Sequence, residues 1–187
     1  MRKLSILIPS IPERTGIRNR LLNDLFKQID DLKVQDEVQV LLHIDDGIKS
    51  IGTKRNELLK NAESEYIAFV DDDDRVSPNY VALLLGAIST NPDCVNLIGE
   101  LTTNGRNPQT FTHSIEFDGW YEKDKILYRY TNHLNCIKTE IAQQIGFPEW
   151  NFKEDQDYST RLQQSGLLKV EHHISEVLYY YDYITHK

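Results

Sequence analysis

Cysteine is scarce in this 187-residue chain, which has two, and glycine (9) and proline (6) are also few. Two cysteines without a CxxC motif or a nearby histidine pair exclude a disulfide framework and a zinc site, and favour a reduced, cytoplasmic protein. The low glycine and proline content excludes collagen-like and low-complexity chains. Apolar runs such as Tyr66–Val70 are far shorter than the ~20 residues that cross a bilayer. We therefore expect no transmembrane segment and, because the apolar stretch after Met1 is short, no signal peptide.

An excess of positive charge is lacking as well. The chain has 21 Lys and Arg against 29 Asp and Glu, a formal net charge of −8 at pH 7. Such a surface repels nucleic acid and anionic lipid, so we expect no bulk nucleic acid binding. Hydrophobic residues (40%) and charged residues (27%) are at the levels of a globular protein. The length predicts one domain, over residues 1–187.

Strand and helix patterns alternate through the first hundred residues. The segments Leu4–Pro9, Val38–Ile44, Tyr66–Val70 and Cys94–Glu100 are typical of buried strands, and apolar residues at helical spacing lie between them. This order predicts an α/β fold with a doubly wound, mostly parallel sheet flanked by helices. In such sheets ligands bind beyond the carboxyl ends of the strands. The residues that follow each strand are therefore the candidates for function.

The pattern becomes less regular towards the C-terminus. Ser77 and Pro78 predict the start of the helix before the fourth strand, as an N-cap followed by proline. The last two expected strands are predicted to form a closing pair. Beyond residue 100 the expected strands are 111–117, 126–130, 134–137, 168–172 and 177–184, and the expected helices are 139–146 and 154–164.

Four adjacent aspartates, Asp71–Asp74, directly follow the third expected strand. Their mutual repulsion destabilises the folded state unless a counter-charge is present. Mg²⁺ or Mn²⁺ supplies such a charge through one or two carboxylates, with phosphate oxygens and water completing its shell. A solvated acidic turn that caps the next helix is the alternative. An EF-hand is excluded, because the sixth and twelfth positions are Val76 and Ala82 instead of Gly and Glu.

Basic residues follow the first two expected strands. Arg14 comes after a proline-containing turn, and Lys54 and Arg55 lie near the start of an expected helix, where a diphosphate binds favourably. We hypothesise that a basic pocket forms in this otherwise acidic protein, with Arg14, Arg18, Arg20, Lys49, Lys54 and Arg55 as its candidates. Ordinary solvated helix positions are the alternative for Lys54 and Arg55. Arg18 and Arg20 are interpreted as surface charges on the first helix.

A second acidic group, residues 154–157, opens a later helix. Carboxylates in a first helical turn often act as caps or interact with the helix dipole, which is one interpretation. The other is a general base, since a carboxylate aimed into a cleft accepts a proton from a hydroxyl group. The nearby Phe147, Trp150 and Phe152 either stack on a sugar or belong to the core. The histidines are interpreted as structural or surface groups, with His186 the strongest candidate for a ligand.

Taken together, these segments resemble the family 2 glycosyltransferases, which have the GT-A fold of nucleotide-diphospho-sugar transferases. An aspartate pair after the second strand, a G-x-KRN helix start, a DxDD motif and a downstream ED carry the resemblance. It implies a single minimal domain with a nucleotide-binding half (1–100) and an acceptor and catalytic half (101–187). The matching stretches are SILIPSIPER, HIDDG, GTKRNELLKNAESEYIAFVDDDDRVSPNYV and FKEDQDYSTRL.

The resemblance also implies roles for individual residues. Asp73 would be the principal ligand of Mn²⁺ or Mg²⁺, with Asp71 beside it and His186 as a further ligand. Asp155 would be the base that deprotonates the acceptor hydroxyl. The nucleotide would be bound by Pro9, Ser10, Ile11, Arg14, Asp45, Lys54, Arg55, Asn56, Asp71 and Asp72.

The implied activity is that of a metal-dependent inverting glycosyltransferase. It would move a hexosyl or N-acetylhexosaminyl group from a nucleotide sugar, with UDP favoured, to a hydroxyl of a glycan or another acceptor. Two alternatives stay open. One is a sugar nucleotidyltransferase of the same fold, against which the single Gly16 in the first loop argues; the other is a non-catalytic domain that binds nucleotide sugars. Since the chain ends soon after its last expected strand, we expect no additional helices that hold acceptors.

Overall fold

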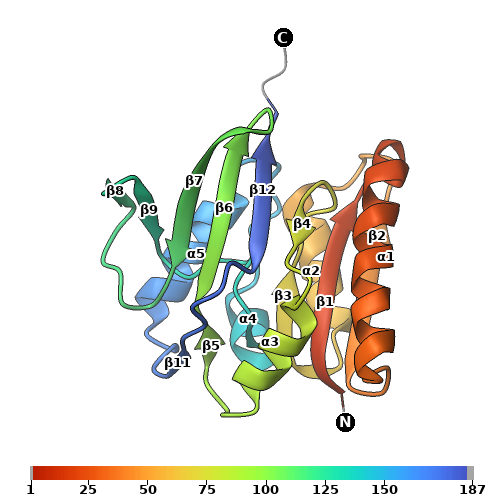
Figure 1. Ribbon diagram of the computed structural model, residues 1–187, viewed down its shortest axis with the longest axis horizontal. Coiled ribbons are helices and arrows are strands. Elements are labelled where there is room, and N and C mark those ends of the chain that lie inside the picture. Colours follow the sequence, from red (N-terminus) through yellow and green to blue (C-terminus); the bar gives the residue numbers. More distant parts are fainter. Residues whose placement is uncertain (1, 185–187) are drawn as a thin grey trace.

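In the computed structural model, which describes residues 2–184, the strands and helices form a mixed α/β fold with two six-stranded sheets side by side (Figure 1). The first sheet has the order β11 (Glu171–His172), β5 (Cys94–Val95), β10 (Ile137–Lys138), β3 (Ser64–Phe69), β1 (Arg2–Ser10), β2 (Val38–Ile44). The second has the order β4 (Arg75–Val76), β12 (Tyr179–Tyr183), β6 (Leu97–Thr103), β7 (Arg106–His113), β9 (Ile126–Arg129), β8 (Tyr121–Lys123). The helices are η1 (Pro12–Arg14), α1 (Thr15–Leu32), α2 (Ile51–Asn61), α3 (Tyr80–Ile88), α4 (Thr139–Ile145) and α5 (Glu154–Ser165). Within residues 2–184, no helix is both long enough and apolar enough to cross a bilayer.

Strand β1 is buried on both faces, which explains its nearly unbroken apolar sequence. Leu4, Ile6 and Ile8 belong to one core cluster, together with apolar side chains of α1 and α3. Leu7 belongs to a second cluster, with side chains of α2, α4 and α5. Successive side chains of a strand point to opposite faces, so helices cover both faces of the first sheet. Because β1 also pairs in parallel with β2 and β3, the fold class expected from the sequence is confirmed.

The fourth predicted strand passes from one sheet to the other at Asn96. The Asn96 amide donates a hydrogen bond to the Ile174 carbonyl (3.1 Å), and its Oδ1 accepts one from Ile174 N (2.7 Å). Residues before Asn96 form β5 in the first sheet, and residues after it form β6 in the second. The predicted sheet is thus divided into two.

Helix α3 begins later than the Ser77-Pro78 signal predicts. Tyr80 is its first residue, and the backbone N–H of Tyr80 donates to the Ser77 carbonyl (3.1 Å). Asn79 precedes the helix and makes no side-chain capping bond. Ser77 and Pro78 therefore form a turn that leads into the helix.

Strand β12 joins the two halves of the chain. It pairs in parallel with β6 and antiparallel with β4, the short strand that follows the acidic turn. The closing pair expected from the sequence would join β12 to β11. Instead, β11 lies beside β5 in the first sheet. Strands from both halves share each sheet, and the functional division at residue 100 stays a prediction.

Candidate active site

The four aspartates form a turn beyond the carboxyl end of β3. A hydrogen bond from Asp74 N to the Asp71 carbonyl closes the turn (3.1 Å). The carboxyl ends of β1 and β3 both point towards the upper end of the molecule in Figure 1, as expected of parallel neighbours. The four carboxylates have different partners, and these partners separate their roles.

Asp72 connects the acidic turn to the end of β1. Its buried carboxylate accepts hydrogen bonds from Ser10 Oγ (2.5 Å) and Arg14 Nη1 (2.7 Å). Arg18 donates to the same Ser10 hydroxyl (2.8 Å) and to the Ile11 carbonyl (3.1 Å). The prediction that Arg18 is a surface charge is therefore wrong, because these acceptors hold its guanidinium in the interior. Asp72 thus fixes the positions of Ser10 and Arg14.

Asp73 is the most exposed of the four, with 41% of its side chain accessible. Arg14 Nη1 lies 3.1 Å from its Oδ2. Burial raises the pKa of Asp73, the Arg14 charge lowers it, and the charges of Asp71 and Asp72 raise it again, with a net increase. A bound cation would relieve this repulsion. Asp73 therefore has the exposure and the environment of a metal ligand.

Asp71 belongs to a buried network of charges around Arg55. Arg55 Nη1 donates to Glu154 (2.5 Å), and Nη2 donates to Asp71 (3.0 Å) and lies 3.0 Å from His133 Nε2. The guanidinium also lies over the Phe147 ring, 5.5 Å from its centroid. Burial alone would raise the pKa of Asp71, but Arg55 and His133 together bring it well below its usual value. Asp71 therefore carries a negative charge at the cavity wall.

Asp74 attaches the turn to the second sheet. The Tyr179 hydroxyl donates to Asp74 Oδ2 (2.7 Å) and accepts a hydrogen bond from Asp71 N (3.1 Å). Burial, and next the charge of Asp71, raise the pKa of Asp74 to about 8. Asp74 is therefore suited to holding the turn on β12.

Lys54 forms another part of the wall, next to the end of β2. Its Nζ donates to the Ser10 carbonyl (3.2 Å) and lies 3.1 Å from Asp45 Oδ1. Asp45 Oδ2 accepts a hydrogen bond from Lys49 N (2.7 Å). That bond, together with the contact to Lys54, lowers the pKa of Asp45 against the opposite effect of burial. The ammonium group of Lys54 is thus held beside the turn that follows β1.

Two cavities share Asp71 and Tyr181 as wall residues. The smaller, of about 190 Å³, contains the predicted base Asp155 together with Asp74, Arg129 and His133. The larger, of about 370 Å³, contains the predicted metal ligand Asp73 and most of the predicted nucleotide-binding residues: Pro9, Ser10, Ile11, Arg14, Lys54, Arg55, Asp71 and Asp72.

Two described residues of the predicted site, Asp45 and Asn56, lie outside both walls. Asp45 is connected to the larger cavity through Lys54. The Asn56 amide donates to the Phe147 carbonyl and accepts from Phe147 N (2.8 Å each), so it fixes the loop before α5. His186 lies outside the described residues. The ligand-binding roles of these three stay predictions.

Sequence reasoning missed several residues of the site, among them Glu154, His133, Tyr179, Tyr181 and Arg129. Glu154 lies in the acidic group already singled out, but its pairing with Arg55, 99 positions away, leaves no local signal. Tyr179 and Tyr181 are two positions apart on β12, so they lie on one face of that strand. Only the sheet order reveals that this face meets the acidic turn.

The three aromatic residues before α5 divide between core and surface. Phe147 is buried and stacks on Tyr158, with ring centroids 4.2 Å apart. Trp150 and Phe152 are 54% and 85% exposed. The Trp150 carbonyl accepts a hydrogen bond from Gly52 N (3.1 Å), which docks this loop on the start of α2.

The donor atoms at the acidic turn fit a metal ion that also binds its substrate. Among residues 2–184, no three His, Cys, Asp or Glu side chains converge as a ready-made metal site. A magnesium or manganese ion that bridges phosphates takes only one or two protein carboxylates, however. Asp73 and the partly exposed Asp71 supply that number at the edge of the larger cavity.

A sequence profile described as Glycosyl transferase family 2 matches residues 22–146. The matched range contains Asp45, Lys54, Arg55 and the acidic turn. A curated relative is the glucosyl-dolichyl phosphate glucuronosyltransferase of Haloferax volcanii, which is 24% identical over 159 residues. The match covers 83% of this chain and 47% of the relative, so the chain spans about half of that protein's length.

Solved structures of S. aureus TarS are similar to this chain. TarS 1–349 gives a TM-score of 0.66 at 19% identity and covers 96% of this chain. Its complex with UDP-GlcNAc gives 0.67 at 18% identity over 99% of this chain, and its complex with UDP gives 0.67 at 19% over 96%. In each case the match covers 60% of the TarS chain. At this level of identity the likeness shows a shared fold.

Proposed function

This chain belongs to glycosyl transferase family 2, and from that premise we propose that it transfers a sugar from a nucleotide sugar to an acceptor hydroxyl group. We propose that the donor is a UDP-sugar and that the cofactor is Mn²⁺ or Mg²⁺. The transferred group is a hexosyl or N-acetylhexosaminyl group, and the reaction inverts the configuration at the anomeric carbon. The observation that carries the proposal is the single cavity in which Arg14, Lys54 and Arg55 face Asp71 and Asp73. The UDP and UDP-GlcNAc complexes of TarS, which has the same fold, support a nucleotide-sugar ligand.

The donor site combines positive charge with an apolar wall. Pro9 and Ile11 line the cavity at the end of β1, where a flat base would pack against them. Arg14 and Lys54 supply positive charge for the diphosphate, and both are already oriented by carboxylates. Charged groups held in advance lose little rotamer freedom when the ligand binds.

Asp73 would hold the metal ion, with Asp71 beside it. When bound, the ion supplies Lewis-acid chemistry that neutralises the charge of the diphosphate leaving group. The protein contributes the positions of both carboxylates, because Asp72 and Asp74 fix the turn on either side of Asp73.

Asp155 is the proposed general base in the adjoining cavity. No side chain among residues 2–184 donates a hydrogen bond to its carboxylate, so the carboxylate is available to a hydroxyl group. It takes the hydroxyl proton as the acceptor oxygen bonds to the anomeric carbon. The bond from that carbon to the diphosphate oxygen breaks on the opposite face, which inverts the configuration.

We place the reaction in the cytoplasm. Cys94 and Cys136 are free and buried, as in proteins of reducing compartments. Burial raises the pKa of both thiols, so they stay protonated and unreactive.

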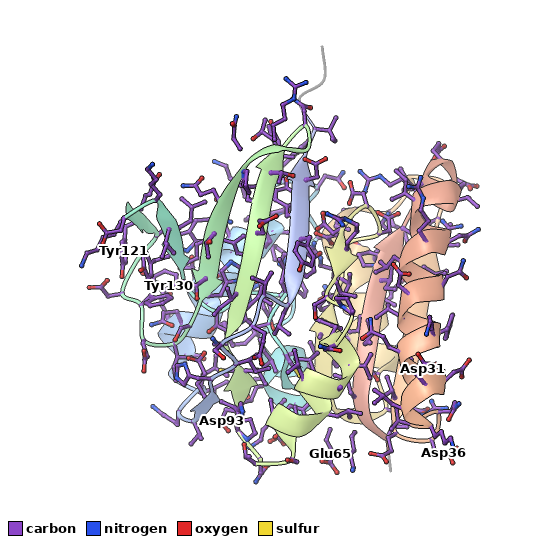
Figure 2. The ribbon with its side chains drawn as sticks, in the orientation of Figure 1. Asp31, Asp36, Glu65, Asp93, Tyr121 and Tyr130 are labelled. Carbon is purple, nitrogen blue, oxygen red and sulfur yellow. The ribbon has the colours of Figure 1, made fainter. Side chains whose placement is uncertain are left out.

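Thermal unfolding with UDP, dTDP or GDP, each with and without Mn²⁺, tests the proposal. We expect UDP and Mn²⁺ together to stabilise the protein by ~2.7 kcal/mol at a hundredfold excess over Kd. Asp73→Asn should remove the part of the stabilisation that depends on Mn²⁺. Asp155→Asn should keep that stabilisation, but in an assay of sugar transfer its kcat should be ~10²–10⁴-fold lower. The control is Asp36→Asn, an exposed carboxylate at the lower end of the molecule (Figure 2).

Three results would contradict the proposal. The first is the absence of any shift with every nucleotide and cation. The second is release of pyrophosphate in place of a nucleoside diphosphate, which would indicate a sugar nucleotidyltransferase. The third is nucleotide-sugar binding without transfer or hydrolysis, which would indicate a non-catalytic domain.

A further inference from the structure

Arg129, the last residue of β9, forms no ion pair within residues 2–184, although it shares a cavity with Asp155. It lines the smaller cavity together with Asp155 and His133. Its guanidinium makes no hydrogen bond to any residue in the range 2–184, and no carboxylate of that range lies within 4.0 Å of it. Arg14, Lys54 and Arg55, by contrast, each form an ion pair with a carboxylate.

The hairpin of β8 and β9 places the ring of Trp120, the residue before β8, against the Arg129 side chain. The guanidinium carbon lies 5.2 Å from the centroid of the Trp120 ring. Next to it, Tyr121 and Tyr128 stack across β8 and β9, with centroids 5.0 Å apart and an interplanar angle of 12°. Figure 2 shows Tyr121 and Tyr130 on this outer flank of the second sheet, on the side away from α1. A contact with a ring face leaves the five N–H donors of the guanidinium free for a ligand.

The surroundings of Arg129 favour an incoming anion. Burial lowers the pKa of Arg129, while the charge of Asp155 raises it, and the net change is a decrease. Burial removes hydration from the guanidinium, and the net decrease in its pKa means that the Trp120 ring and the Asp155 charge do not fully replace that hydration. An anion of the ligand would restore those interactions, and a planar guanidinium binds phosphate or carboxylate through two parallel hydrogen bonds.

We infer that Arg129 binds an anionic group, a phosphate or a carboxylate, on the acceptor and so brings the neighbouring acceptor hydroxyl to Asp155. This inference rests on the proposed function and names the acceptor class: a sugar phosphate or an acidic glycan. The donor diphosphate has its own cations in the larger cavity, so Arg129 is available to the acceptor. The net charge of −8 disfavours anionic ligands, so the binding of an anionic acceptor needs a local cation such as Arg129.

Isothermal titration of protein saturated with UDP and Mn²⁺ tests this inference. The probes are glucose 6-phosphate, glucuronate and glucose, because the first two distinguish the anions and the third is neutral. We expect at least one anionic probe to bind at least tenfold more tightly than glucose. Arg129→Gln should abolish the difference and Arg129→Lys should retain part of it. The control is Arg106→Gln, which removes the same charge from an exposed position on β7.

Equal binding of all three probes, or an anion preference that survives in Arg129→Gln, would overturn the inference. A loss of equal size in Arg106→Gln would do so as well, since it would show a general effect of charge. The thermal shift with UDP and Mn²⁺ separates the two proposals. If that shift is present and the anion preference is absent, only the inference fails; if UDP does not bind, the proposed function fails and the inference falls with it.

Discussion

At the scale of single residues, the four aspartates show how partners assign different tasks to identical side chains. Asp72 and Asp74 accept hydrogen bonds from Ser10 and Tyr179 and hold the turn. Asp71 is paired with Arg55, and Asp73 faces the solvent. Adjacent positions of one turn therefore tolerate substitution very differently.

Arg55 is the residue whose loss we expect to cost the most stability. Arg55→Ala leaves the buried Glu154 carboxylate without its partner, and breaking such a buried pair costs ~3–5 kcal/mol. The matched control is Lys49→Ala, which removes an exposed pair with Glu57 and should cost ~0–1 kcal/mol. Urea unfolding measures both. Equal losses in the two variants would show that the Arg55 network does not stabilise the fold.

At the scale of elements, the contact between α2 and the loop before α5 determines the wall of the larger cavity. Gly52 allows this contact, since a Cβ at that position would lie 1.8 Å from the Pro148 carbonyl oxygen. The loop carries Asn151, and α5 begins with Glu154, both of which line the cavity. A change in this contact should therefore affect both stability and nucleotide binding.

Gly52→Ala and Gly86→Ala should have opposite effects. The new methyl group of Gly52→Ala forces the loop away, with a loss of ~1–3 kcal/mol and weaker UDP binding. Gly86 lies inside α3 with nothing within 4 Å of its Cβ position, so alanine should stabilise the protein by ~0.4–1 kcal/mol. Thermal unfolding with and without UDP measures both effects. Stabilisation of the Gly52→Ala variant would contradict the proposed contact.

The elements could be predicted largely from local patterns, because strands and helices follow hydrophobic periodicity. The β1, β2 and β3 segments and the position of Asp71–Asp74 beyond a strand are examples. The division into two sheets could not be predicted, since it depends on the contact of Asn96 with Ile174, 78 positions away. The same holds for Arg129, because the inferred role depends on its three-dimensional surroundings, where it forms no ion pair within residues 2–184.

At the scale of the whole molecule, the second sheet contains a buried histidine that makes folding sensitive to acid. His113 is fully buried, and its Nδ1 lies 3.2 Å from Asn135 Oδ1. Burial, and next the charge of Arg129, lower the pKa of His113 from its ordinary value of 6.5 to about 3. Between these values the unfolded chain binds a proton that the folded protein does not bind. The free energy of unfolding should therefore fall as the pH decreases from 6.5 towards 3.

His113→Asn, which keeps an amide donor near Asn135, should reduce this dependence on pH. One proton contributes at most ~1.4 kcal/mol per pH unit. Urea unfolding at pH 6.5 and pH 5 should therefore show a smaller loss in the variant by up to ~2 kcal/mol. His173→Asn is the control, because that imidazole is exposed. An unchanged dependence on pH in His113→Asn would contradict this assignment.

The anchoring of the acidic turn by Tyr179 has a consequence for biosynthesis. The tyrosine is translated 105 positions after Asp74, the side chain that it holds. A nascent chain whose β12 is still inside the ribosome therefore carries the aspartates without the hydroxyl that orders them. The pocket that we propose to bind the cation and the nucleotide is therefore completed only after that strand emerges, among the last parts of the described chain.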